Sequence, residues 1–227
     1  NNIGDNFVSK CLSWYLKKSM DYPQLSLALS MGQLRKQGHN VSYSKNIINY
    51  NFDLYIVSSS IVAHETELKA IKQITSNNCK VIVIGPFGTS LPQPYINAGA
   101  KVLIGEPEFY FVDKPKTKQD FMDLPSVITF TNFFTADDLE YPAWDLIFKT
   151  SKPKLGFLAR GATLPILATR GCPYSCSYYC TYPLQQGKKV KSRDPVKVVE
   201  EMIYWSKILN VRNFQFRDPV FTITKKF

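Results

Sequence analysis

The sequence has few of the features that mark membrane proteins or disulfide-rich secreted proteins. Its 227 residues contain no apolar run near the ~18 residues that span a bilayer, so we expect no membrane span. The first residues do not place a charged start before an apolar stretch, so no secretory signal is visible. Histidine occurs only twice, and the five cysteines form an odd number. An odd total without a signal argues against a disulfide framework and favours a reducing, cytoplasmic location.

Acidic residues are outnumbered by basic ones, and the formal net charge is +10. Such a balance suits nucleic acid, an acidic partner or anionic cofactors. The basic residues are scattered through both halves of the chain, and no nucleic-acid-binding motif accompanies them. We therefore interpret them as solvated surface groups and expect no nucleic-acid partner.

Residues 1–110 alternate between helical and strand-like segments. A helix is expected to open at Tyr22-Pro23 and to stop at Gly38. The further elements expected are a strand at 39–43, a strand at 53–58, a helix at 65–75 and strands at 80–84 and 101–104. Strands that are apolar throughout are buried on both faces, which indicates a parallel α/β sheet covered by helices.

Small and polar residues follow three of these strands. In a parallel sheet, ligands bind beyond the carboxyl ends of the strands, so these residues are candidates for binding a cofactor. They are Ser58, Ser59, Ser60, Gly85, Pro86, Gly105 and Glu106. A single glycine is explained more simply as a turn residue. The prediction of cofactor binding rests on the occurrence of three such stretches at strand ends.

The remaining chain divides into a connector and a second βα pattern. Residues 111–163 hold four prolines and no sustained period, although Tyr141 to Asp145 is expected to fold back on one of the domains. From Leu164 a strand is expected to lead into a cysteine-rich segment. Asp194-Pro195 then predicts a helix start, with Asp as N-cap and Pro at the first helical position. A strand at 211–216 should follow.

Three of the cysteines, Cys172, Cys176 and Cys180, lie within nine residues. Three thiolates in one loop can converge on a single metal site. An iron–sulfur cubane normally takes four cysteines, so three would leave one iron open to a small molecule. Zinc is the competing interpretation, but a structural zinc site takes four ligands, and both histidines lie more than a hundred residues away. Cys11 and Cys79 are isolated, which favours small, partly buried packing residues.

The segment Thr169-Arg-Gly-Cys-Pro-Tyr-Ser-Cys-Ser-Tyr178 resembles the cluster loop of radical S-adenosylmethionine (radical SAM) enzymes, and the resemblance covers residues 164–227. Upstream segments are similar to the cobalamin-binding domain and connector that often precede that barrel: Pro23 to Ala28, Gly38-His39, Gly85-Pro86, Gly105 to Glu108, Asp123 to Pro125 and Tyr141 to Asp145. The resemblance implies an α/β chain with a Rossmann-like parallel-sheet cobalamin-binding domain at 1–110, a connector at 111–163, and the start of a radical SAM partial (βα) barrel at 164–227.

The resemblance also implies a function and its residues. Cys172, Cys176 and Cys180 would hold a [4Fe–4S] cluster whose open iron binds S-adenosylmethionine, and Tyr179 would lie near the adenine. Arg217 and Asp218 would face the methionine moiety, or would instead form a surface pair. The implied activity is generation of a 5′-deoxyadenosyl radical. A cobalamin-dependent methyltransferase is one kind of enzyme in the family that would fit. The implied partners are a small-molecule substrate and a reductant protein such as flavodoxin or ferredoxin.

The chain departs from the family pattern in three ways. Its cysteines are spaced C-x3-C-x3-C, whereas the family has C-x3-C-x2-C. The cobalt-ligating motif D-x-H-x-x-G is absent, so any cobalamin would bind without a protein histidine on cobalt. Both domains lack expected pieces, and we expect the chain alone to be inactive. Two alternatives stay open: a degenerate or truncated cofactor-binding module without activity, and a zinc-binding interaction domain.

Overall fold

A computed structural model describes residues 24–45, 50–113, 117–131, 134–150, 152–153, 161–176 and 180–221, and the single residues Val8, Cys11 and Ile223. A four-stranded sheet forms the centre of the first half. Its strands are β1 (Leu54–Ser58), β2 (Lys80–Ile84), β3 (Lys101–Leu103) and β4 (Val127–Ile128). They lie in the order β1-β2-β3-β4, and every neighbouring pair is parallel. The parallel α/β sheet predicted from the apolar strands is confirmed.

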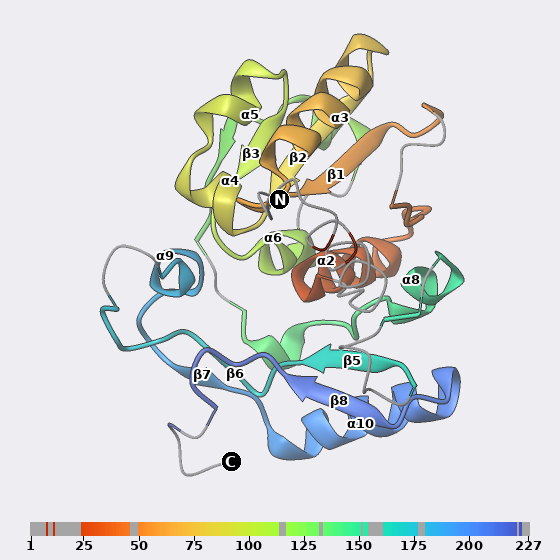
Figure 1. Ribbon diagram of the computed structural model, residues 1–227, viewed down its shortest axis with the longest axis vertical. Helices are drawn as coiled ribbons and strands as arrows, with labels where there is room; N and C mark the ends of the chain where they lie inside the picture. The colour runs from red at the N-terminus through yellow and green to blue at the C-terminus, as the bar shows by residue number, and fades with distance from the viewer. Residues whose placement is uncertain are drawn as a thin grey trace.

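Strand β2 shows why the sheet is covered on both faces. Val81 and Val83 point to one side, where they pack with residues of α3 (His64–Ser76) and α5 (Gln93–Asn97). Ile82 and Ile84 point to the other, where they pack with α2 (Leu25–Lys36) and α6 (Pro107–Asp113). Alternate side chains of a strand face opposite ways, so a strand between two helical layers is apolar at every position. Figure 1 shows the two helical layers on opposite sides of the sheet.

Two predictions for the first 130 residues need correction. The strand expected at 39–43 is wrong, because those residues form no strand. They leave the end of α2 as a loop, in which the His39 ring packs edge-on against Phe121 and Val41 packs against the core. Conversely, β4 lies inside the stretch interpreted as a connector. Its two residues are too few to show a period, and it forms by pairing with β3.

The connector stretch also contains α7 (Lys118–Met122), the short 3-10 helix η1 (Ala136–Asp138) and α8 (Trp144–Thr150). The predicted return of residues 141–145 is present. The Ala143 N–H donates to the Ala28 carbonyl (2.8 Å), and Trp144 is fully buried. A side chain at Gly32 would place its Cβ 2.5 Å from the Tyr141 carbonyl oxygen. Glycine at this position therefore lets residues 141–144, which we call the strap, lie directly on α2.

The second half is a parallel β–α–β unit with an inserted loop. Strand β5 (Thr163–Ile166) pairs in parallel with β8 (Asn213–Phe216), and α10 (Pro195–Leu209) connects to β8. The Asp194 carboxylate accepts the Val196 N–H (2.9 Å), which confirms the predicted N-cap. The inserted loop holds α9 (Tyr182–Gln186) and an antiparallel pair, β6 (Thr169–Arg170) with β7 (Lys191–Ser192). In Figure 1, α2 and α6 lie between this unit and the four-stranded sheet.

A third cluster of apolar side chains joins the two halves. Ala28 of α2 and Trp144 of α8 pack with Leu164, Trp205 and Val211 of the second half. Trp144 and Trp205 are among the largest fully buried side chains of the described chain. In the same described residues, no helix is long and apolar enough to cross a bilayer.

Candidate functional site

The carboxyl edge of the sheet is closed by hydrogen bonds between neutral groups. The Ser59 hydroxyl donates to the Ile84 carbonyl (2.7 Å) and accepts the Gly88 N–H (2.7 Å). Gly105 N–H donates to the Thr89 hydroxyl (3.2 Å). A Cβ on Gly85, which has φ +101°, would lie 3.1 Å from the Ser59 carbonyl oxygen. The structure thus brings the three predicted stretches together at one edge, and their role in binding a cofactor stays a prediction.

A second group of polar side chains lies at the end of β1. The Ser60 N–H and hydroxyl donate to Glu67 Oε1 (2.9 and 3.2 Å), and the Tyr95 hydroxyl donates to Glu67 Oε2 (2.7 Å). His64 Nδ1 lies 3.2 Å from the same hydroxyl. Burial, and then the bond to Glu67, raise the pKa of Tyr95, so it remains a neutral donor. Sequence reasoning placed Ser60 here and missed the rest of the group, Glu67 and His64 of α3 and Tyr95 of α5.

Glu106, Glu108 and Arg170 form what we call the arginine–glutamate junction. Arg170 Nη1 forms ion pairs with Oε1 of Glu106 (2.7 Å) and with Oε1 of Glu108. The side chains are 3%, 8% and 1% exposed for Arg170, Glu106 and Glu108. The guanidinium also lies over the Phe109 ring, 5.1 Å from its centre. Glu106 was predicted to bind a cofactor; its carboxylate contacts Arg170, and its role in binding a cofactor stays a prediction.

The electrostatics of the junction are unbalanced. Two carboxylates share one guanidinium, and Glu108 Oε2 and Arg170 Nε have no hydrogen-bond partner among the described residues. Burial raises the pKa of Glu106, and neighbouring Glu108 raises it further, against the opposing effect of Arg170 and Lys191. The junction therefore favours retaining a proton on Glu106 more than an exposed carboxyl does.

The cysteine loop begins directly after the junction. Gly171 has φ +82°, and a Cβ there would lie 2.2 Å from the Lys189 carbonyl oxygen, so only glycine fits. Its N–H donates to Gln186 Oε1 (3.0 Å), and Cys172 N–H donates to the Gly187 carbonyl (3.1 Å). Cys172 is buried, Cys180 is half-buried and Cys176 is exposed.

The three thiols are not gathered in this structure. Among the residues that the structure describes, no group of three or more His, Cys, Asp or Glu side chains is arranged to hold a metal ion. Residues 177–179, which include the predicted adenine neighbour Tyr179, lie outside the described residues. The cysteines thus share one loop, as the sequence indicates, and their role as ligands stays a prediction.

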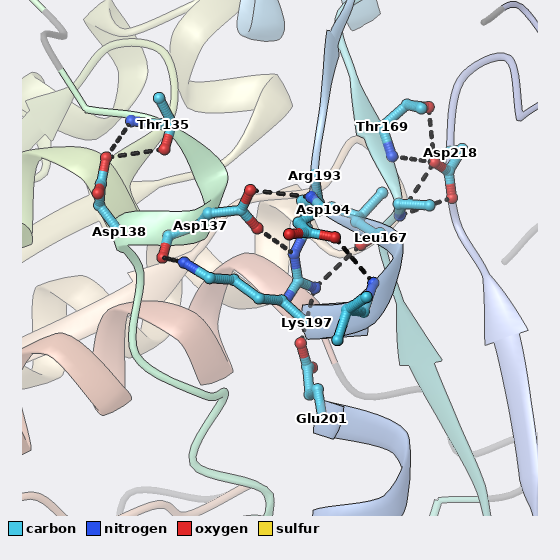
Figure 2. Close-up of polar contacts among 12 residues, drawn as sticks. Thr135, Asp137, Asp138, Leu167, Thr169, Arg193, Asp194, Lys197, Glu201 and Asp218 are labelled. Atoms are coloured by element: carbon cyan, nitrogen blue, oxygen red, sulfur yellow. Dashed lines mark hydrogen bonds and ion pairs between the residues drawn. The ribbon is translucent and has the colours of Figure 1, made fainter. Parts of the chain in front are cut away.

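The other two predicted cofactor residues follow β8. The Asp218 carboxylate accepts the Ala168 N–H (3.1 Å), the Thr169 N–H and the Thr169 hydroxyl (2.6 Å), as Figure 2 shows. Asp218 thus fixes the strand end that leads into the cysteine loop. The Arg217 side chain is exposed, and the backbone N–H of Arg217 donates to the Ile166 carbonyl (2.8 Å).

Arg193 forms a second, partly buried ion cluster beside this strand end (Figure 2). It pairs with Glu201 of α10 (2.7 Å) and with Asp137 of η1 (3.6 Å), and it donates to the Leu167 carbonyl (3.0 Å). Burial raises the pKa of Glu201, against the opposing effect of Arg193. Arg170 and Arg193 line one small cavity of about 20 Å³. That volume suits a single water and is far too small for a cofactor.

The cysteine loop and the sheet edge are neighbours in space. Helix α9 packs against α4 (Pro86–Ser90), which begins at the end of β2. A Cβ on Gly105 would lie 3.7 Å from the Gln185 carbonyl oxygen of α9. The two candidate regions identified in separate halves of the sequence therefore form one continuous region of the molecule.

Comparison with known proteins relates the chain to two proteins that are named as methyltransferases. No protein-family model matches the chain. It is 26% identical over 197 residues to a protein of Synechocystis sp. named an uncharacterized methyltransferase, which covers 80% of this chain and 33% of that protein. It is 30% identical over 91 residues to a protein of Pyrococcus horikoshii with the same description, which covers 40% of this chain and 18% of that protein. The chain thus spans about a third or less of these relatives.

Proposed function

We propose that this chain belongs to a radical SAM enzyme whose reaction is a methyl transfer. The observation that carries the proposal is the position of the cysteine loop, which follows β6 and lies against the carboxyl edge of a parallel sheet. The names of the two relatives support methyl transfer, and S-adenosylmethionine is the methyl donor that such a name suggests. The whole enzyme's substrate would be a small molecule, and its electron donor a protein such as flavodoxin or ferredoxin.

The chemistry of the cysteine loop fits an iron–sulfur cluster. Cys172, Cys176 and Cys180 supply three thiols from nine residues, and thiolates are the usual ligands of such clusters. Because the thiols are not gathered among the described residues, cluster binding requires the loop to close. When bound, a [4Fe–4S] cluster supplies an electron to the sulfonium of S-adenosylmethionine. Cys172 is the thiol whose backbone is already held, by the bond from its N–H to Gly187.

The remaining predicted residues take supporting roles in this proposal. The Asp218 carboxylate holds the backbone of residues 168–169, so it orients the strand end from which the loop leaves. Arg217 would contact the methionine moiety, and Tyr179 the adenine. At the sheet edge, Ser58, Ser59, Ser60, Gly85, Pro86, Gly105 and Glu106 would accept the tail of a cobalamin. Cobalamin is the less supported cofactor, because the Ser59 hydroxyl already has partners within the edge.

Anaerobic reconstitution of the purified chain with iron and sulfide tests the cluster. We expect about four irons and four sulfides per chain, and loss of both in Cys176→Ala. Cys79→Ala is the matched control: Cys79 lies just before β2, outside the cysteine loop, and its removal should leave the iron content unchanged. Equal iron in the Cys176 and Cys79 variants would contradict the proposal.

The ungathered thiols favour a second candidate, a cofactor-binding module without activity, whereas a zinc-binding interaction domain would need them to converge as a cluster does. Metal analysis separates these possibilities. Stoichiometric zinc with no iron after anaerobic handling would support the zinc-binding domain. Iron with no cleavage of S-adenosylmethionine under strong reduction, measured on the whole enzyme, would support the inactive module.

A further inference from the structure

The arginine–glutamate junction joins parts of the chain that lie far apart in the sequence. Glu106 and Glu108 follow β3 at the sheet edge, and Arg170 comes 64 and 62 positions later, at the end of β6. Arg170 is followed directly by Gly171 and Cys172. The junction therefore connects the first thiol of the cysteine loop, through one side chain and two backbone positions, to the carboxyl edge of the sheet.

We propose that Arg170 is a positioning residue that holds Cys172 in its buried place and so sets the cysteine loop against the sheet edge. The proposal rests on the proposed function in one respect, because there Cys172 is the first of three cluster ligands. The ion pairs of Arg170 themselves form without any cofactor.

The other anchors of Cys172 belong to the loop itself. The N–H groups of Gly171 and Cys172 bond to Gln186 and Gly187, which close the same loop. Those bonds keep the loop's shape, but they can move with it as one body. Arg170 differs because its two partners belong to the first half of the molecule. Its ion pairs therefore fix the Cys172 end of the loop relative to the sheet, as the packing of α9 on α4 fixes the other end.

The charges of the junction give this anchor its specificity. A buried guanidinium that leaves its carboxylates must either stay uncompensated in a low-dielectric interior or draw the loop into water. Either alternative is unfavourable, so one loop position is selected over others. All three side chains are at least nine-tenths buried, which means that solvent does not screen the contacts.

Alkylation of the cysteines in the iron-free chain measures the anchor directly. Iodoacetamide modifies an exposed thiol quickly and a buried one only when the structure opens locally. Site-resolved mass spectrometry should find Cys176 modified early and Cys172, which is 6% exposed, modified late. Cys176 also serves as the internal measure of reagent activity in every variant.

The decisive variant removes the junction without leaving a buried charge. Arg170→Met combined with Glu106→Gln and Glu108→Met removes all three ionisable groups of the junction, and such replacements of buried ion pairs are often neutral or stabilising. The variant should therefore fold. We expect Cys172 to be modified about tenfold faster or more than in the original chain, while Cys176 is unchanged. Slow modification of Cys172 in this folded variant would overturn the proposal.

The conservative substitution Arg170→Lys distinguishes a charge-based role of Arg170 from a general role in packing. Both carboxylates contact one nitrogen of Arg170, so a lysine ammonium placed there can bond to both. We expect Arg170→Lys to restore the slow modification of Cys172, and rapid modification in that variant would count against a charge-based anchor.

Ile74→Ala controls for global destabilisation. Ile74 lies in the core between α3 and the far face of the sheet, and its truncation destabilises without touching the junction. Its Cys172 rate should stay within about twofold of the original chain, provided that the protein remains folded. If Ile74→Ala accelerates modification as much as the junction variant does, Arg170 has no special part. Iron content is measured separately, so failure of cluster binding and failure of this anchor give different results.

Discussion

The sheet edge and the cysteine loop are neighbours that are held by opposite means. At the edge, the Ser59 hydroxyl and the Gly88 and Gly105 amides make neutral hydrogen bonds. At the loop, one buried guanidinium meets two buried carboxylates. A neutral bond contributes only about 1 kcal/mol net, whereas removing one member of a buried ion pair leaves a costly unpaired charge. The edge is thus expected to tolerate change in steps, and the loop to fail as a unit.

The largest expected effect is the loss of the Arg170 charge alone. Arg170→Met leaves two carboxylates buried with no cation between them and should lower the free energy of unfolding by about 3–5 kcal/mol. Arg35→Met removes an ion pair to Asp145 of the same kind (2.8 Å), but those side chains are 44% and 32% exposed. That control should lose less than about 1 kcal/mol. Urea titration of both variants measures the difference, and equal losses would remove the contrast between buried and exposed pairs.

Gly171 tests whether the loop is also fixed by its backbone. Gly171→Ala adds a Cβ at a positive φ and against the Lys189 carbonyl, so we expect a loss of about 3 kcal/mol. Gly187→Ala is the matched control, since Gly187 has φ +79° and open space around it. It should lose only about 1 kcal/mol, the cost of the backbone conformation. A thermal melt of each variant suffices, and similar melting temperatures would show that the loop yields easily at residue 171.

Ser59 tests the tolerance of the sheet edge. Ser59→Ala leaves the buried Gly88 N–H without its acceptor, and we expect a loss of about 1–2 kcal/mol with the fold retained. The control is Ser90→Ala, because the exposed Ser90 hydroxyl bonds only to the Pro86 carbonyl of its own helix. It should change the free energy of unfolding by less than about 0.5 kcal/mol. A loss at Ser59 as large as that at Arg170 would mean that neutral and charged contacts do not differ here.

The smallest expected effect is a pH dependence from Glu106. Its pKa is raised above the ordinary value of 4.5, chiefly by burial, so the folded chain binds more protons than the unfolded chain. The associated stability is fully present below pH 4.5 and is lost as the pH rises through the raised pKa. Glu106→Gln cannot titrate, so its stability should fall less steeply than that of the original chain as the pH rises from 4.5 toward neutrality. Parallel slopes in chemical denaturation would contradict this assignment.

The sequence predicted the parts of the fold that have a local cause. Strand β2 is apolar because both of its faces are covered, and α10 begins where Asp194 caps it. Such patterns are visible in a single segment. Strand β4 is not, because it forms through its partner β3, and residues 39–43 alternate like a strand although no strand pairs with them. Hydrophobic periodicity within one segment does not predict secondary structure that depends on contacts with distant segments.

The candidate site shows the same division. The three cysteines and the three strand ends were identified because each is a short cluster in the sequence. Arg170 was noted only as part of a motif, and its pairing with Glu106 crosses 64 positions. Charged residues are usually exposed, so nothing in the sequence alone marks these as buried. Whether the thiols converge depends equally on how the loop folds, which residue spacing does not determine.

The strap that lies on α2 has a consequence for how the protein is made. Residues 141–144 contact Ala28 and pass directly over Gly32, yet they leave the ribosome more than a hundred residues after α2 does. At ~5–20 residues per second, that delay is on the order of ten seconds. Throughout it, the Ala28 side of α2 has no cover from Trp144 or from the second half. We expect nascent chains to pass through an intermediate that exposes this apolar surface. Chaperones can bind that surface until residues 141–144 have been translated.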